Sequence, residues 1–262
     1  MKYLYTNGCS FTWGGGFEDD FLQEHGYDFF DSKEVSSKLG VGDKSGWLES
    51  SQPNSEEFEN WRCDNTWPKH TASELDLKII KDESLGGSSN ARIIRTTIDS
   101  FKGFIKSGKE MDTLALIQLT DSTRFDLYSN YSKERILGKV DVWDWHPNKN
   151  PKEKNALKEF FECFVDSETC DKHLIEQIIL LQSFFKVYGI RYKFIWGWSY
   201  PLDKDLYELV DLDNFVFSGN QSMINFMWDN YNQDCYESRH LRPSGHEIWG
   251  QTLARDLWET QL

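Results

Sequence analysis

The chain has 262 residues, of which 39% are hydrophobic, and a formal net charge of −14. It is long enough to bury a core, and its acidic balance argues against nucleic acids and anionic membranes as partners, because both bind clustered Lys and Arg. Five scattered cysteines form no CxxC pair, so we expect neither a zinc site nor a disulfide framework.

The chain also lacks the sequence signals of membrane insertion and export. No apolar run approaches the roughly 20 residues of a membrane span. The apolar run after Met1 is too short for a signal peptide, and no cleavage pattern follows it. We therefore expect a cytoplasmic protein.

Short apolar runs alternate with segments of helical spacing along the chain. Predicted strands cover residues 2–6, 76–80, 113–120, 191–198 and 214–218. Predicted helices begin near residue 66 and cover residues 91–108, 152–187, 223–231 and the segment from residue 244 onward. The alternation predicts one domain over residues 1–262, a three-layer α/β/α sandwich with a parallel, flavodoxin-like sheet of about five strands.

Two of the predicted helices begin with capping residues. Thr66 precedes Pro68 in the order of an N-cap followed by a first-turn proline. Ser244 and Glu247 have the spacing of a capping box, in which each side chain bonds the other residue's amide. Both patterns predict where a helix begins.

An acidic, polar stretch of about residues 18–60 shows little periodicity. Loops of this length in compact domains are usually functional or mobile. Because the stretch begins soon after Ser10, we expect it to start at the carboxyl edge of the sheet and to act there as a partial lid.

Candidate functional residues directly follow four of the predicted strands. These are Ser10, Gly86–Asn90, Thr120–Arg124 and Trp198. In open parallel sheets, functional groups gather at the carboxyl ends of the strands, so these residues should converge. Side chains alternate along a strand, so at most one of Trp196 and Trp198 should face such a site.

Ser10 is a candidate nucleophile if a base can take its proton. His240, just before the last helix, is the best candidate base, and Glu237 lies three residues earlier as the acid that would orient the imidazole. Asp234 is a second choice for the acid. The alternatives are that Ser10 only caps a helix and that His240 is structural. Cys9 is expected to be a small buried residue behind the nucleophile.

Three segments resemble the blocks of the SGNH (GDSL-like) hydrolases, in particular a variant group with a GCSFT first block. They are "NGCSFTWG", "LGGSSNARI" and "ESRHLRPSGHEIWGQTL", in the family's order. The resemblance implies an oxyanion hole formed by the amides of Ser10 and Gly87, with Gly86 as the second choice.

The third block of the family departs from its GxND pattern in this chain, which has "QLTDSTRFD" instead. Ser122 lies nearest the position of the missing Asn, whose side chain gives an oxyanion bond in the family. Thr120 or Asn90 are the alternatives for that donor.

These residues predict a serine esterase or acyl hydrolase that acts on a small acyl ester, with acetyl esters and carbohydrate esters as candidates. Arg124 and Trp198 are the predicted substrate-binding residues, and no cofactor or metal is expected. The alternative is a non-catalytic binding or structural protein of phage type, virion components included, built on the same fold with a degenerate site.

Overall fold

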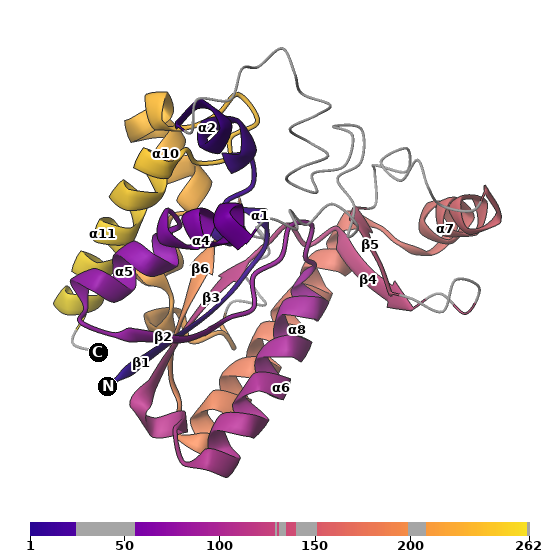
Figure 1. Ribbon diagram of the computed structural model, residues 1–262. Helices are drawn as coiled ribbons and strands as arrows, with labels where there is room; N and C mark the ends of the chain where they lie inside the picture. The colour runs from indigo at the N-terminus through magenta and orange to yellow at the C-terminus, as the bar shows by residue number, and fades with distance from the viewer. Residues whose placement is uncertain (25–55, 129, 131–134, 140–150, 199–207, 261–262) are drawn as a thin grey trace.

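The computed structural model describes residues 1–24, 56–128, 130, 135–139, 151–198 and 208–260. Four parallel strands form the central sheet in the order β2-β1-β3-β6 (Figure 1). They are β1 (Tyr3–Asn7), β2 (Lys78–Asp82), β3 (Thr113–Leu119) and β6 (Arg191–Trp196). The α/β sandwich predicted from the sequence is confirmed.

The predicted fifth strand, 214–218, is reduced to one parallel bridge between Phe215 and Phe194. Short 3₁₀ turns flank it, and Phe217 and Ser218 take left-handed backbone angles, with φ of 53° and 50°. The bridge lies beside β6, where a flavodoxin-like sheet has its fifth strand, and the turns on either side prevent a longer pairing.

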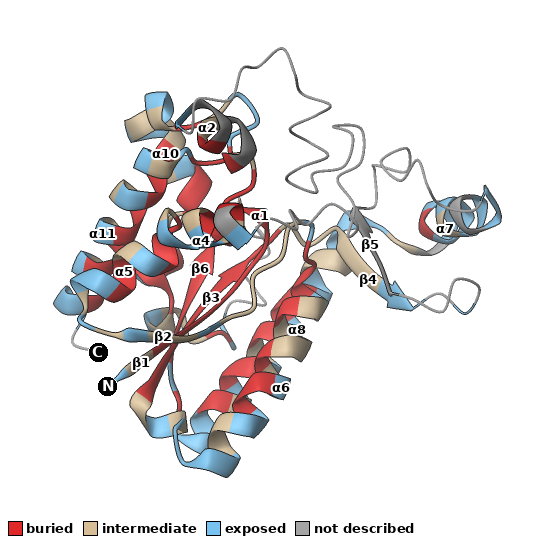
Figure 2. Ribbon diagram, viewed as in Figure 1, coloured by how far each residue is buried: buried red, intermediate tan, exposed pale blue. Residues whose placement is uncertain are grey.

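Helices cover both faces of the sheet, as Figure 1 shows. One face carries α6 (Asn90–Ser107) and α8 (Ser167–Tyr188). The other carries α5 (Trp67–Glu74), α10 (Met223–Tyr231) and α11 (Pro243–Glu259). Every residue of β3 is buried between these layers, and Figure 2 shows buried residues along β1, β3 and β6 and on the inner sides of the helices.

The capping box predicted at the last helix is wrong. Helix α11 begins one residue earlier, at Pro243, whose fixed φ and missing N–H suit the first helical position. Ser244 therefore lies inside the first turn, and its hydroxyl donates to Asp234 Oδ1 at 2.6 Å. The Glu247 carboxylate accepts from Gln251 instead of returning to the helix start.

Thr66 is the N-cap residue of α5, as predicted, but its hydroxyl donates to the Cys63 carbonyl and makes no cap bond. His246 of α11 takes over that role: its Nδ1 accepts from the Trp67 N–H at 3.1 Å. The imidazole is buried, and burial holds its pKa well below the ordinary value, so it stays neutral as an acceptor. A side chain of one helix thus fixes the start of its neighbour.

The described ends of the 18–60 stretch are helical. They are α2 (Phe17–Glu24) and α4 (Glu56–Asp64), which pack through an aromatic cluster of Phe17, Phe21, Phe58 and Trp61. Both lie near α1 (Ser10–Trp13), beyond the carboxyl end of β1 (Figure 1). Residues 25–55 are outside the described part of the chain, so the lid stays a prediction.

The sequence did not predict the antiparallel hairpin of β4 (Arg124–Tyr128) and β5 (Arg135–Lys139), which follows β3. It projects from the sandwich together with α7 (Pro151–Phe164) (Figure 1). An ion pair of 2.7 Å between Arg95 of α6 and Asp126 ties the hairpin to the helix layer. Within the described residues, no helix is both long and apolar enough to cross a bilayer.

The tight contact between α5 and α11 gives a test of the packing. A Cβ at Gly250 would lie 2.6 Å from His70 Cβ and 3.0 Å from the Trp67 carbonyl oxygen, so Gly250→Ala should lower the free energy of unfolding by about 1–3 kcal/mol. Urea unfolding measures this. At Gly103 of α6 a Cβ meets nothing within 4 Å, so the control Gly103→Ala should raise stability by about 0.5–1 kcal/mol. Equal effects of the two substitutions would contradict the packing.

Candidate active site

Ser10 is placed by a sharp turn from β1 into α1. A Cβ at Gly8 would collide with the Thr12 hydroxyl and would lie 3.1 Å from Gln118 Cβ, so only glycine fits there. Cys9 is the buried N-cap, and Ser10 is the first helical residue. Its amide therefore has no acceptor within the helix and remains available to a ligand.

His240 lies on a short loop that closes on itself before α11. The loop is framed by an antiparallel bridge between Cys235 and Leu241. Inside it, the Tyr236 N–H donates to the His240 carbonyl at 2.8 Å, and the Arg239 N–H donates to the Tyr236 carbonyl at 2.8 Å. Arg239 takes a left-handed φ of 65°, which lets the chain reverse in so few residues.

Ser10 and His240 meet at the carboxyl edge of the sheet. The Ser10 Oγ lies 2.8 Å from His240 Nε2, within the hydrogen-bond reach that a nucleophile and its base require. Both residues are buried, with exposed fractions of 2% and 9%. The Phe11 ring stacks on the imidazole at a centroid distance of 4.6 Å.

The run of glycines after Ser10 has a packing role. A Cβ at Gly15 would lie 3.1 Å from Ser10 Cβ and 3.1 Å from His240 Cδ2. Gly14 and Gly16 adopt φ values of 82° and 97°, which side chains rarely tolerate. The glycines let the chain leave α1 directly against the Ser10–His240 pair.

The structure does not place the Glu237 carboxylate on the imidazole. Glu237 is exposed, and the His240 Nδ1 atom lies 3.2 Å from the Ser238 hydroxyl. The reversal of the chain between Tyr236 and Arg239 turns residue 237 toward solvent, so the three-residue spacing did not predict the contact correctly. Asp234, the second choice, accepts from Ser244.

Burial, and to a smaller extent the positive charge of Arg124, lowers the pKa of His240 from its ordinary value of 6.5 to about 4. The imidazole is therefore neutral at pH 7. The contacts of its two nitrogens fit the tautomer in which Nδ1–H donates to Ser238 and Nε2 accepts from Ser10. That tautomer can take the proton of Ser10.

The predicted oxyanion donors have different surroundings. Gly87 is exposed, has a φ of 78°, and has open space where a side chain would be. Gly86 instead faces the Trp13 ring, because a Cβ added at Gly86 would lie 3.6 Å from Trp13 Cε3. Gly87 therefore remains the better candidate for a backbone N–H that a ligand can approach.

Asn90 is not available as an oxyanion donor. Its side-chain nitrogen donates to the Thr120 carbonyl at 2.9 Å, and its oxygen accepts from the Thr120 N–H at 2.9 Å. The same nitrogen also donates to the Asp121 carbonyl over a longer distance of 3.4 Å. Asn90 thus clamps the end of β3, a role that sequence reasoning missed.

Thr120 and Ser122 remain as candidates to replace the missing Asn, and the buried hydroxyl of Thr120 is the better placed of the two. Thr120 is 4% exposed, and its Oγ1 has no hydrogen-bond partner among the described residues. In the register of β1 and β3, Asn7 pairs with Ile117, and Ser10 and Thr120 each follow that pair by three residues at the same edge of the sheet. Ser122 is half-buried in the turn that follows.

The two predicted substrate-binding residues border the pair. Trp198 packs edge-on against Phe11 at 5.0 Å, which makes it a second aromatic layer behind His240. Trp196 packs against Phe215 in the opposite core, so only one of the two tryptophans lies on the Ser10 side, as predicted. Arg124, at the start of β4, reaches the Ser88 carbonyl at 3.5 Å.

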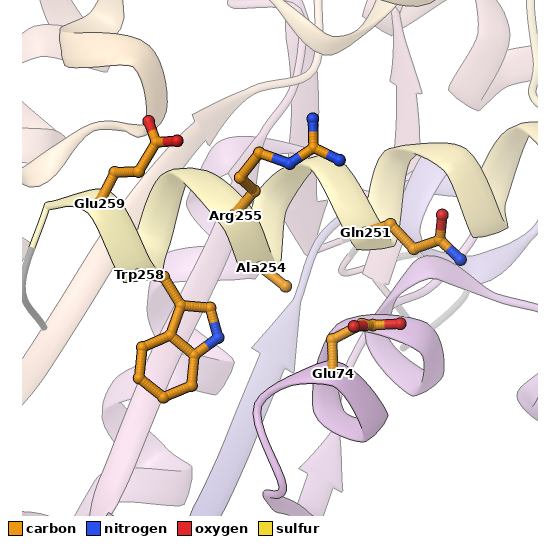
Figure 3. A pocket seen from close by; sticks show the side chains of 6 residues that line it. All are labelled: Glu74, Gln251, Ala254, Arg255, Trp258 and Glu259. Carbon is orange, nitrogen blue, oxygen red and sulfur yellow. The ribbon is translucent and has the colours of Figure 1, made fainter.

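A surface groove of about 580 Å³ lies elsewhere, between α5 and the second half of α11. Figure 3 shows the side chains that line it: Glu74, Gln251, Ala254, Arg255, Trp258 and Glu259. It contains no nucleophile with a neighbouring base, so it does not compete with Ser10 as the candidate site. In the described parts of the chain, no three His, Cys, Asp or Glu side chains gather as metal ligands would.

The lowered pKa of His240 predicts acid sensitivity. Below pH 6.5 the imidazole of His240 is protonated in the unfolded chain, whereas in the folded protein it stays neutral down to about pH 4. The free energy of unfolding therefore falls as the pH drops from 6.5 to 4. The loss due to His240 is on the order of 3 kcal/mol. In urea unfolding, His240→Gln should remove that part of the pH dependence. Parallel wild-type and variant profiles between pH 6.5 and 4 would contradict the assignment.

Comparison with known proteins identifies a family whose function is unknown. A model described as a family of unknown function, DUF6071, matches residues 48–256. The matched segment includes Gly87, Asn90, Arg124 and His240 but begins after Ser10. No curated protein matches the chain. The chain therefore belongs to the DUF6071 family.

Proposed function

We propose that the protein is a serine acyl hydrolase that cleaves a small acyl ester, with Ser10 as nucleophile and His240 as general base. The observation that carries the proposal is the 2.8 Å contact between Ser10 Oγ and His240 Nε2 at the carboxyl edge of a parallel sheet. Exposed thiols at Cys63 and Cys163 fit a reducing, cytoplasmic setting.

In the proposed mechanism, His240 Nε2 takes the hydroxyl proton while Ser10 Oγ attacks the ester carbonyl. The resulting imidazolium gives that proton to the leaving alcohol, and an acyl-Ser10 intermediate remains. Water then attacks the acyl group, again with His240 as base, which releases the acid and restores Ser10. The low pKa of His240 keeps the base neutral at neutral pH but makes it a weak proton acceptor.

Three groups are proposed to stabilise the oxyanion: the N–H of Ser10, the N–H of Gly87 and the Thr120 hydroxyl. The first lies at a helix start and the second beside open space. The third is a buried hydroxyl without a partner in the described chain, a state that costs free energy unless a ligand uses it.

The resemblance to SGNH hydrolases supports the same proposal. The fold is of the expected class, and the first and last resembling blocks supply the two residues that touch. The match to the family model covers residues 48–256, after the first block, and the family's description names no activity, so the resemblance rests on the residues of this chain.

One observation favours the alternative, a non-catalytic binding or structural protein. Glu237 is exposed and does not contact the imidazole, although an acid at this position orients the base in the resembling enzymes. A degenerate site of this kind would retain the fold and lose the reaction.

A panel of p-nitrophenyl esters of short acids tests the proposal. Ser10→Ala and His240→Ala should each lower kcat/KM by about 10³-fold or more, because each removes a group that the chemical step needs. Glu237→Gln should stay within about threefold of wild type, because the carboxylate is exposed. Thermal unfolding at pH 7.5 should show each variant folded.

The ester panel also has a result that contradicts the proposal. If wild type and Ser10→Ala hydrolyse every ester at the same rate, Ser10 is not a nucleophile. If Glu237→Gln loses as much activity as His240→Ala, the acid acts on the base after all and the exposed position of Glu237 does not describe the working site.

The proposed third oxyanion donor has its own test. Thr120→Val keeps the shape of the side chain and removes the hydroxyl, so kcat should fall by about 10- to 10³-fold with KM nearly unchanged. Ser122→Ala is the matched control and should leave kcat within about twofold of wild type. A fall of kcat in Ser122→Ala with none in Thr120→Val would reverse the assignment.

A further inference from the structure

Arg124 is an arginine beside the candidate site whose charge has no counter-ion among the described residues. Three other arginines of the described chain form ion pairs with carboxylates: Arg62 with Glu59, Arg95 with Asp126, and Arg242 with Asp20. Arg124 forms none in the part of the chain that the structure describes, and its guanidinium donates to the Ser88 carbonyl at 3.5 Å. Arg92 also lacks an ion pair there, but its guanidinium donates to the Glu83 carbonyl at 3.1 Å and to the Ser88 hydroxyl at 3.0 Å, whereas Arg124 has the one contact of 3.5 Å.

Arg124 lies next to the segment that carries a candidate oxyanion donor. Ser88, which it contacts, directly follows Gly87, the exposed candidate oxyanion donor. On the other side, its charge acts on His240 strongly enough to affect the imidazole. The guanidinium therefore lies beside the Gly87–Ser88 segment and near enough to His240 for its charge to act there, and its side chain is half-buried and reachable from solvent.

The backbone holds Arg124 in this place. Its N–H donates to the Asp121 carbonyl at 3.2 Å, and the Asn90 clamp fixes the chain at Thr120 just before that turn. Beyond it, the Arg95–Asp126 ion pair fixes the hairpin. The fold thus fixes the backbone at Arg124, while its guanidinium has the one long contact to Ser88 and keeps donors that a ligand can use.

We infer that the substrate carries an anionic group, a carboxylate or a phosphate, which Arg124 binds next to the ester that Ser10 attacks. The inference deepens the proposed function and rests on it for its catalytic form, because an anion at Arg124 lies beside the reacting bond only if Ser10 is the nucleophile.

A bound anion would also assist the base. Free Arg124 opposes the positive charge that His240 must acquire when it takes the serine proton. A carboxylate or phosphate on the guanidinium neutralises that opposition, so the charged substrate would raise the proton affinity of His240 on binding. A neutral ester gives no such help.

The kinetic arm of the test compares two esters that differ in charge, p-nitrophenyl acetate and mono-p-nitrophenyl succinate. Arg124→Gln should lower kcat/KM for the succinate about tenfold more than for the acetate, the scale of one charge-assisted hydrogen bond. Arg191→Gln is the matched control, because it removes an exposed arginine at the amino end of β6. It should leave the ratio of the two kcat/KM values as in wild type.

The binding arm does not require turnover. In Ser10→Ala protein, the ring signals of His240 are titrated by NMR with and without succinate or inorganic phosphate. Each anion that binds should raise the pKa of His240, and the combined Ser10→Ala and Arg124→Gln variant should not respond. The anion that raises the pKa of His240 more, succinate or phosphate, indicates whether the substrate carries a carboxylate or a phosphate.

The outcomes separate this inference from the proposed function. If no ester is hydrolysed but the anions still raise the pKa of His240 through Arg124, the esterase proposal fails and the anion site stands. If esters are hydrolysed but neither anion shifts His240, the anion inference is overturned. It is also overturned if Arg124→Gln slows both esters equally, because Arg124 then acts on the developing oxyanion.

Discussion

Backbone and side chains meet so closely at the end of β1 that positions 8 and 15 accept only glycine without movement of their neighbours. Gly8 lets the chain turn from strand to helix against Thr12 and Gln118, and Gly15 lets it leave that helix against Ser10 and His240. The contact between Ser10 and His240 depends on both approaches. It also depends on the short reversal at Tyr236–His240 that carries the imidazole across the sheet edge.

This packing sets the electrostatics of the pair. An imidazole between Phe11 and Gly15 has lost its water, so its neutral form is favoured and its pKa lies near 4. The half-buried charge of Arg124 acts in the same direction. The same surroundings that keep the base neutral therefore oppose the imidazolium of the proposed reaction, and a bound anion would relieve that opposition. Burial of the imidazole and the charge of the substrate would therefore act in opposite directions on the proton affinity of His240.

Local patterns predicted the sheet because strands β1, β3 and β6 are short apolar runs buried from both faces, as Leu114 and Leu116 are. The β4–β5 hairpin was missed because it projects from the sheet and carries no such run. Ser10 and His240 were predictable because they follow a strand and precede a helix. Glu237 and Asn90 were not, since a loop reversal turns one to solvent and a tertiary clamp occupies the other. Sequence spacing carries no information on either.

The claim that Ser10 is an activated nucleophile can be measured without knowing the substrate. The protein is treated with a fluorophosphonate at pH 7.5, and intact mass and peptide mapping locate the adduct. We predict one adduct per chain, on Ser10, that is absent in Ser10→Ala and forms at least about 10²-fold more slowly in His240→Gln. An unlabelled wild-type protein, an adduct on another serine, or undiminished labelling of His240→Gln would contradict that claim.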